Sequence, residues 1–185
     1  MPLSPAASRK MLHMRDIQLR GYQREDGLVD IEARITDVKT YSWDSLHRRG
    51  KSGEPLHEMW MRITIDRHML IHECEASTEA APYDVCPKAA PNFARLAGLV
   101  IGKGFVKAAM QRVGGVEGCT HLRELLQPMA TVAFQTMVGI RNDPGKPARG
   151  LAHAVINSVL LNTCLAYDEK GAIVADSKAQ QDSEA

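Results

Sequence analysis

Cys119 and His121 lie two residues apart in the segment GGVEGCTHL, residues 114–122. The glycines allow a sharp turn, and an apolar helical run follows. The first backbone N–H groups of a helix are unpaired, and the helix dipole adds partial positive charge there. A thiol in that position is expected to ionise readily. His121, in the first turn, can exchange protons or bind a metal.

Metal binding requires more ligands than these two, since zinc takes four protein ligands in structural sites and three in catalytic ones. Thiolate and imidazole ligands suit both zinc and iron. An open coordination position would let such a metal act on a small organic substrate. The candidate ligand set is Cys86, Cys119, His121 and Cys164. Three histidines of the predicted strand region are further candidates: His13, His57 and His72.

Other interpretations of the same residues stay open. In a metal-free enzyme, Cys119 is the catalytic nucleophile or acid and His121 its base. In a structural interpretation, Cys119 is a small buried hydrophobe, Thr120 is the N-cap of the helix and His121 covers the helix end. The chain can also be a non-enzymatic accessory or binding module. Whether it is an enzyme is undecided, and among the functional interpretations we favour metal binding.

Alternating residues predict the strands that position this segment. From Val29 to Thr36, apolar and polar residues alternate strictly, which is typical of a strand with one buried face. Asp26-Gly27 is a strong hairpin signal, so residues 14–24 should form the partner strand. A second alternating run at 59–66, followed after a turn by 69–76, predicts a second hairpin.

Helices are predicted in the second part of the chain. Pro91 favours a short helix over 91–98, and Gly114-Gly115 ends a helix over 105–113. After Gly118, apolar residues recur at helical spacing: Leu122, Leu125, Leu126, Met129, Ala133, Met137 and Ile140. Strands followed by helices indicate an α+β fold, with a small antiparallel sheet from two N-terminal hairpins and helices packed on one face.

The chain length of 185 residues suits one domain. We expect a flexible lead-in over 1–12, a single α+β domain over 13–167 and a mostly disordered tail over 168–185. Residues 141–150 are interpreted as a linker. The apolar segment 151–167 is compatible with either a helix or a buried strand.

Charge and composition narrow the classes of partner. With 23 basic and 22 acidic side chains the net charge is +1, so neither nucleic acid nor an anionic membrane is expected as a partner. No signal peptide and no run of about 18 apolar residues is present. We therefore expect a cytoplasmic protein whose cysteines stay as thiols or ligands. Asp37 and Lys39, near a strand end, are interpreted as a surface ion pair.

Several blocks of the sequence form a recognisable set. They are RGY (20–22) with EDG (25–27) and DIE (30–32), DVKTY (37–41), GEPLHEMW (53–60), AAPY (80–83) with CP (86–87), and GCTHL (118–122) with ELL (124–126). Together they resemble the bacterial domain of unknown function 2889 family over about residues 12–167. The resemblance implies no particular activity. The family often has Cys-His-Ala near position 164, whereas this chain has Cys164-Leu165-Ala166.

A remoter, topological resemblance is to NifU-like iron–sulfur scaffold proteins. Those proteins have an antiparallel sheet, a cysteine in a loop after the strands, and a last cysteine at the start of a late helix. Cys86 and Cys119 stand in comparable places. The resemblance implies a role in cluster assembly, although the scaffold family's cysteine between these two has no counterpart here.

Overall fold

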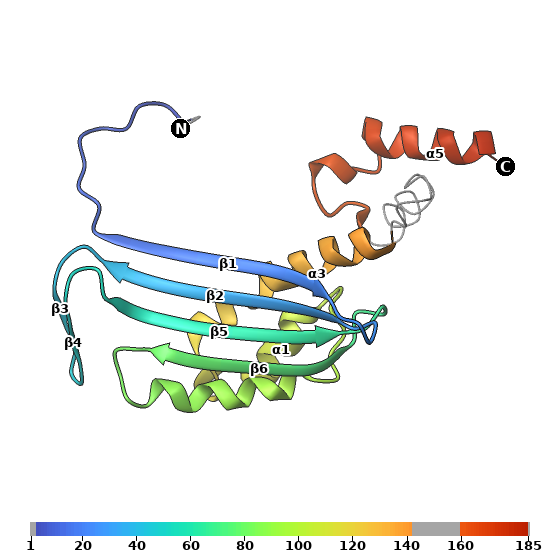
Figure 1. Cartoon of the computed structure of the whole chain (residues 1–185). Helices are drawn as coiled ribbons and strands as arrows, with labels where there is room; N and C mark the ends of the chain where they lie inside the picture. The colour runs from blue at the N-terminus through green and yellow to red at the C-terminus, as the bar shows by residue number, and fades with distance from the viewer. Residues whose placement is uncertain (1–2, 142–159, 185) are drawn as a thin grey trace. The chain divides into compact units, whose positions relative to one another are not determined.

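A computed structural model describes residues 3–141 and 160–184 of the chain (Figure 1). The chain divides into two compact units, Met1–Thr136 and Met137–Ala185. All of the strands described below lie in the first unit. The predicted linker at 141–150 and most of the apolar segment 151–167 lie outside the described residues.

The first unit contains a four-stranded antiparallel sheet in the strand order β1-β2-β5-β6. Its strands are β1 His13–Gln23, β2 Val29–Lys39, β5 Pro55–Ile65 and β6 Ile71–Ala80. A two-stranded ribbon, β3 Trp43–Asp44 and β4 Arg49–Gly50, lies in the connection between β2 and β5. The two predicted hairpins are both present, and Gly27 has the positive φ of 85° that its hairpin turn requires.

Helices follow the strands, which confirms the predicted α+β fold. The first unit contains the 3-10 helix η1 Cys86–Leu96, α1 Phe105–Val113, the 3-10 turn η2 Gly115–Glu117, α2 Thr120–Glu124 and most of α3 Leu126–Arg141. The helix predicted at 91–98 begins earlier, at Cys86, and is of the 3-10 type. Pro91 lies inside it and cannot donate the backbone hydrogen bond of an α-helix.

The core lies between one face of the sheet and these helices, and Figure 1 shows α1 and α3 on the same side of the sheet. Odd-numbered residues of β2 and β5 form the buried face, as their alternation predicts. The apolar stripe of α2 and α3 covers it with five fully buried side chains: Leu122, Leu125, Leu126, Met129 and Ala133.

One close contact fixes α3 against the edge strand β1. A Cβ atom at Gly21 would lie 1.9 Å from Oγ1 of Thr136. The strand and the helix can approach this closely only because position 21 has no side chain.

The second unit contains the 3-10 turn η4 Leu165–Tyr167 and α5 Ala172–Glu184. This helix occupies the tail for which the sequence predicted disorder. Its alanines are good helix formers, and Val174 is fully buried. The domain boundary at 167 remains a prediction, since the contacts divide the chain after Thr136. No described helix has the length and apolar character needed to cross a membrane.

Candidate functional site

The buried face of the sheet changes character at one end. The alternation that buries Val29, Ile31, Ala33 and Ile35 continues to Asp37, whose side chain is only 1% exposed. Asp37 pairs in register with Arg15 of β1 on one side and with His57 of β5 on the other. These three side chains, here called the polar row, therefore lie next to one another across the sheet.

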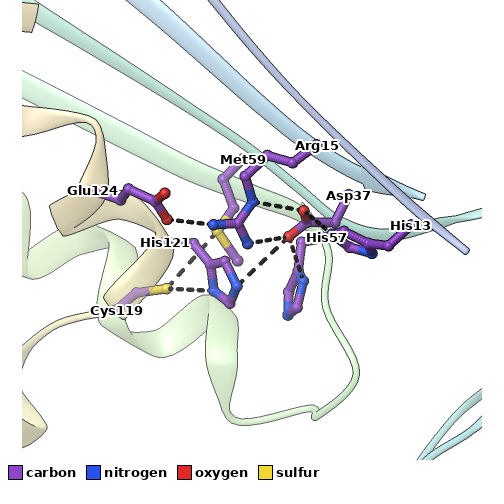
Figure 2. Close-up of polar contacts among 8 residues, drawn as sticks. All are labelled: His13, Arg15, Asp37, His57, Met59, Cys119, His121 and Glu124. Atoms are coloured by element: carbon purple, nitrogen blue, oxygen red, sulfur yellow. Dashed lines mark hydrogen bonds and ion pairs between the residues drawn. The ribbon is translucent and has the colours of Figure 1, made fainter. Parts of the chain in front are cut away.

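Hydrogen-bond donors surround the Asp37 carboxylate, as Figure 2 shows. Arg15 donates from Nε to Oδ1 and from Nη2 to Oδ2, both at 2.7 Å. His13 Nε2 lies 3.0 Å from Oδ1, and His57 Nδ1 lies 3.0 Å from Oδ2. A carboxylate has about four acceptor positions, so all of them are filled. The surface ion pair expected between Asp37 and Lys39 is wrong: Asp37 is buried, and Lys39 contacts Tyr41.

The charge of Asp37 is maintained despite its burial. Burial acts to raise the pKa of Asp37, but hydrogen bonds and charge from Arg15, then from His57, outweigh it and leave the pKa below its usual value. The hydrogen bond with Asp37 in turn raises the pKa of Arg15, so both groups are ionised at neutral pH. Arg15 Nη1 also donates to Glu124, which joins α2 to the sheet.

His121 approaches the polar row from α2. Its ring stacks against that of His57, with centroids 3.8 Å apart and planes at 33°. Its Nε2 lies 3.6 Å from Oδ2 of Asp37. Burial is the main cause that lowers the pKa of both histidines. The neighbouring ring adds to the effect at His57, and the charge of Arg15 adds to it at His121. Both rings are therefore neutral near pH 7.

Cys119 lies directly before α2 and is its N-cap residue, with extended backbone. Thr120, predicted as the N-cap, is instead the first helical residue, and no side chain caps this helix. The Cys119 Sγ lies 3.9 Å from Nδ1 of His121 and 3.8 Å from Sδ of Met59. Gly118 makes this position possible, because a Cβ there would lie 2.0 Å from the carbonyl oxygen of Val113.

A groove of about 460 Å³ opens over these side chains. His57, His121 and Cys119 line it together with Cys86, from the start of η1. Burial raises the pKa of the Cys86 thiol, and the nearby Cys119 raises it further. The volume is in the range typical of small-molecule sites. Two imidazoles and two thiols thus share one small-molecule-sized groove.

The structure brings together three of the four ligands proposed from the sequence: Cys86, Cys119 and His121. Cys164 is exposed and lies in the second unit, directly before η4. Its role as a ligand remains a prediction. His72 contacts Asp66 instead of lining this groove.

Arg15 and Asp37 were not identified as site residues from the sequence, although the sequence contains one signal for Asp37. Asp37 continues the odd-numbered apolar alternation of its strand, and a charged residue on the buried face of a sheet requires a partner. The identity of that partner depends on the register between strands, which the sequence does not reveal.

Ligand atoms of Asp37, His57 and His121 all lie within 4.8 Å of one another, which is close enough for one metal ion. Two observations disfavour this triad as a direct ligand set. The acceptor positions of Asp37 are already filled. Two imidazoles on one tetrahedral zinc, with Zn–N about 2.1 Å, hold their ring centroids about 5 Å apart, whereas these rings are 3.8 Å apart. Asp37 fits better behind the metal ligands than among them.

The fold and the groove together define a small α+β protein with a cysteine–histidine site on one face of its sheet. A family model described as protein of unknown function (DUF2889) matches residues 13–135, and the chain belongs to this family. The match contains the whole polar row and all four groove residues named above. No curated protein and no solved structure matches the chain.

Proposed function

We propose that the groove binds one zinc or iron ion through Cys119 and His121, with Cys86 as a third ligand. The observation that carries the proposal is the position of Asp37. Its Oδ2 lies 3.0 Å from Nδ1 of His57 and 3.6 Å from Nε2 of His121. The opposite ring nitrogen of His121, Nδ1, is then available for a metal. Histidine ligands commonly have a carboxylate on the side of the ring away from the metal, and Asp37 lies on that side of His121.

The distance between sulfur and nitrogen supports the same proposal. A tetrahedral zinc with Zn–S about 2.3 Å and Zn–N about 2.1 Å separates these two ligand atoms by about 3.5 Å. Cys119 Sγ and His121 Nδ1 lie 3.9 Å apart. A small movement of either side chain would bring both into the coordination sphere.

The protonation state of the groove histidines is also favourable to a metal. Imidazole binds a metal only when neutral, and burial lowers the pKa of both His57 and His121. All four cysteines of the chain are free thiols in the structure. We place the protein in the cytoplasm, where such thiols stay reduced and available to a metal. If one coordination position is open, the ion would act as a Lewis acid on a small organic substrate.

The test is elemental analysis of full-length protein purified without oxygen. We expect about one zinc or iron per chain, and a loss of at least tenfold in metal affinity for each ligand variant, Cys119→Ser, His121→Ala and Cys86→Ser. Cys74→Ala is the matched control because Cys74 is buried in β6, outside the groove. Cys164→Ser tests the remaining sequence-based ligand.

Two results together would refute the proposal. The first is a folded wild-type protein without metal, and the second is alkylation of Cys86 and Cys119 at the rate of ordinary thiols. A metal whose content does not change in any of the groove variants would also refute it, because the ion would then be bound elsewhere.

A second candidate is a metal-free thiol or acid–base enzyme. It is favoured by the chain of contacts from Cys119 Sγ to His121 Nδ1, at 3.9 Å, and from His121 Nε2 to Asp37, at 3.6 Å. A nucleophile, a base and an orienting carboxylate follow one another in this order in cysteine and serine hydrolases. In this case Cys119 alkylation would slow in His121→Ala, and Cys86→Ser would have little effect on it.

A further inference from the structure

The groove differs in charge from the rest of the chain. The chain as a whole has 22 acidic and 23 basic side chains. Among the described residues that line the groove there is no aspartate and no glutamate, while Lys88 of η1 and Arg123 of α2 both line it. The groove is therefore a locally positive surface on an almost neutral protein.

The two cations are not neutralised by neighbouring acids. Glu124, next to Arg123, pairs with Arg15, and Glu117 of η2 pairs with Arg95. Within the described part of the chain, neither Lys88 nor Arg123 has an acidic side chain within 4 Å. Unpaired cations beside neutral imidazoles create a positive potential that attracts an anion.

The same groove also has an apolar rim. Val116 is 98% exposed and Val85 is 61% exposed, and both line it together with Tyr83. Exposed apolar side chains around a concave site are typical of a surface that a ligand covers. A ligand that matches this groove has an apolar body and a negatively charged head.

We propose that the groove binds a small organic carboxylate, whose head group contacts Arg123 and Lys88 and whose apolar body covers Val85 and Val116. The planar guanidinium of Arg123 matches a carboxylate with two parallel hydrogen bonds. The remainder of the ligand would lie beside Cys119 and the two histidines. The inference rests on the proposed function, because it takes this groove as the site.

The groove thiols allow a test that needs no knowledge of the natural ligand. Iodoacetate and iodoacetamide alkylate a thiolate by the same displacement of iodide and differ in one negative charge. The ratio of the two rates at Cys119 and at Cys86, read by peptide mass spectrometry, therefore measures the local preference for a carboxylate. The measurement uses the full-length chain, both as purified and after removal of any metal by a chelator.

We expect this ratio to fall about threefold or more at low salt in Arg123→Gln and in Lys88→Gln. Arg20→Gln and Lys107→Gln should leave the ratio unchanged, because these substitutions remove the same charges at positions outside the groove. If Arg123→Gln fails to fold, Lys88→Gln still decides the question, since Lys88 is exposed. A ratio unchanged in the groove variants would overturn the inference.

Protection experiments complete the test. Benzoate should slow the alkylation of Cys119 by iodoacetamide at concentrations at which benzamide, its neutral counterpart, does not. Equal protection by benzoate and inorganic phosphate would show a general anion site and overturn the assignment to an organic carboxylate. Equal effects of benzoate and benzamide would overturn it as well. Failure of the metal proposal would appear separately, in the elemental analysis, and leaves these rates measurable.

Discussion

Two neighbouring rows on the same face of the sheet have opposite character. Ile17, Ile35 and Met59 form an apolar row across β1, β2 and β5, and the polar row Arg15, Asp37 and His57 lies one step further along the same strands. Both rows use the same register. In the apolar row Ile35 and Met59 are fully buried, whereas the polar row lies beside the groove.

The difference indicates what each row contributes. Apolar burial is worth about 25 cal/mol per Å², so the apolar row stabilises the fold directly. A buried carboxylate with its cation is weak evidence for stability, because desolvation offsets the attraction between the charges. We infer that the polar row is retained to orient the two histidines of the groove, whereas the apolar row belongs to the core of the fold.

The largest expected effect is that of Asp37→Asn. The substitution leaves Arg15 and His57 without the carboxylate that both contact, and breaking a buried pair on one side typically costs about 3 kcal/mol. Urea unfolding followed by tryptophan fluorescence measures it, because Trp43 and Trp60 both lie in the first unit.

Asp16→Asn is the control for this prediction. Asp16 is exposed, on the other face of β1, and its loss should change the free energy of unfolding by less than about 0.5 kcal/mol. If Asp37→Asn and Asp16→Asn had the same free energy of unfolding, the prediction that loss of the buried Asp37 carboxylate destabilises the fold would be wrong.

The second prediction concerns the apolar end of the face. Gly21→Ala places a methyl group 1.9 Å from Oγ1 of Thr136, and overpacking of this kind costs about 2 kcal/mol. Gly102→Ala is the control, because a Cβ there meets nothing within 4 Å. In a double-mutant cycle, Thr136→Ala should recover part of the loss. Additive effects of the two substitutions would mean that the strand and helix do not depend on this contact.

Much of the fold could be predicted from local patterns. Alternation gave the buried faces of β2 and β5, Asp26-Gly27 gave the first hairpin, and Gly114 gave the end of α1. Each of these features depends on residues that are close together in the sequence, where propensity and periodicity act. The start of η1 at Cys86 was missed because Pro91, which lies inside this helix, was interpreted as its first residue.

The site could be predicted only in part. The segment with Cys119 and His121 was recognised because both residues lie beside a glycine turn. Asp37 was assigned to the surface because a charged residue at the end of a strand is usually solvated. Its burial depends on Arg15 and His57, which are 22 and 20 positions away. Only the pairing of the strands and the covering helix α2 bring such residues together.

A smaller effect is expected from pH. Burial lowers the pKa of His57 and His121 in the folded, metal-free protein. Between the folded pKa and the unfolded value of about 6.5 the unfolded state therefore binds more protons, and stability is lost as pH falls through this window. The melting temperature of chelator-treated protein should decrease from pH 7.5 to pH 5.5.

The matched variants for this pH series are His57→Gln and His68→Gln. The decrease of the melting temperature with falling pH should be smaller in His57→Gln than in wild type. It should be unchanged in His68→Gln, because His68 lies in an exposed turn. Parallel slopes in all three proteins would mean that His57 does not titrate with an altered pKa.

The smallest change in stability is expected when the polar row is made to match the apolar row. In the triple variant Arg15→Met, Asp37→Leu, His57→Met no buried charge is left unpaired, since His13 and Glu124, the outer partners, are 42% and 46% exposed and can be solvated. Replacing a buried ion pair with apolar residues of similar volume is often neutral or stabilising.

We therefore expect the triple variant to unfold within about 1 kcal/mol of wild type, and to lose the metal that we propose for the groove. Urea unfolding and elemental analysis of the same preparation check both parts. A triple variant as unstable as Asp37→Asn would show that the polar row holds the fold together. A stable triple variant without metal would show that the two rows have different roles: the apolar row stabilises the fold, and the polar row is needed only for the site.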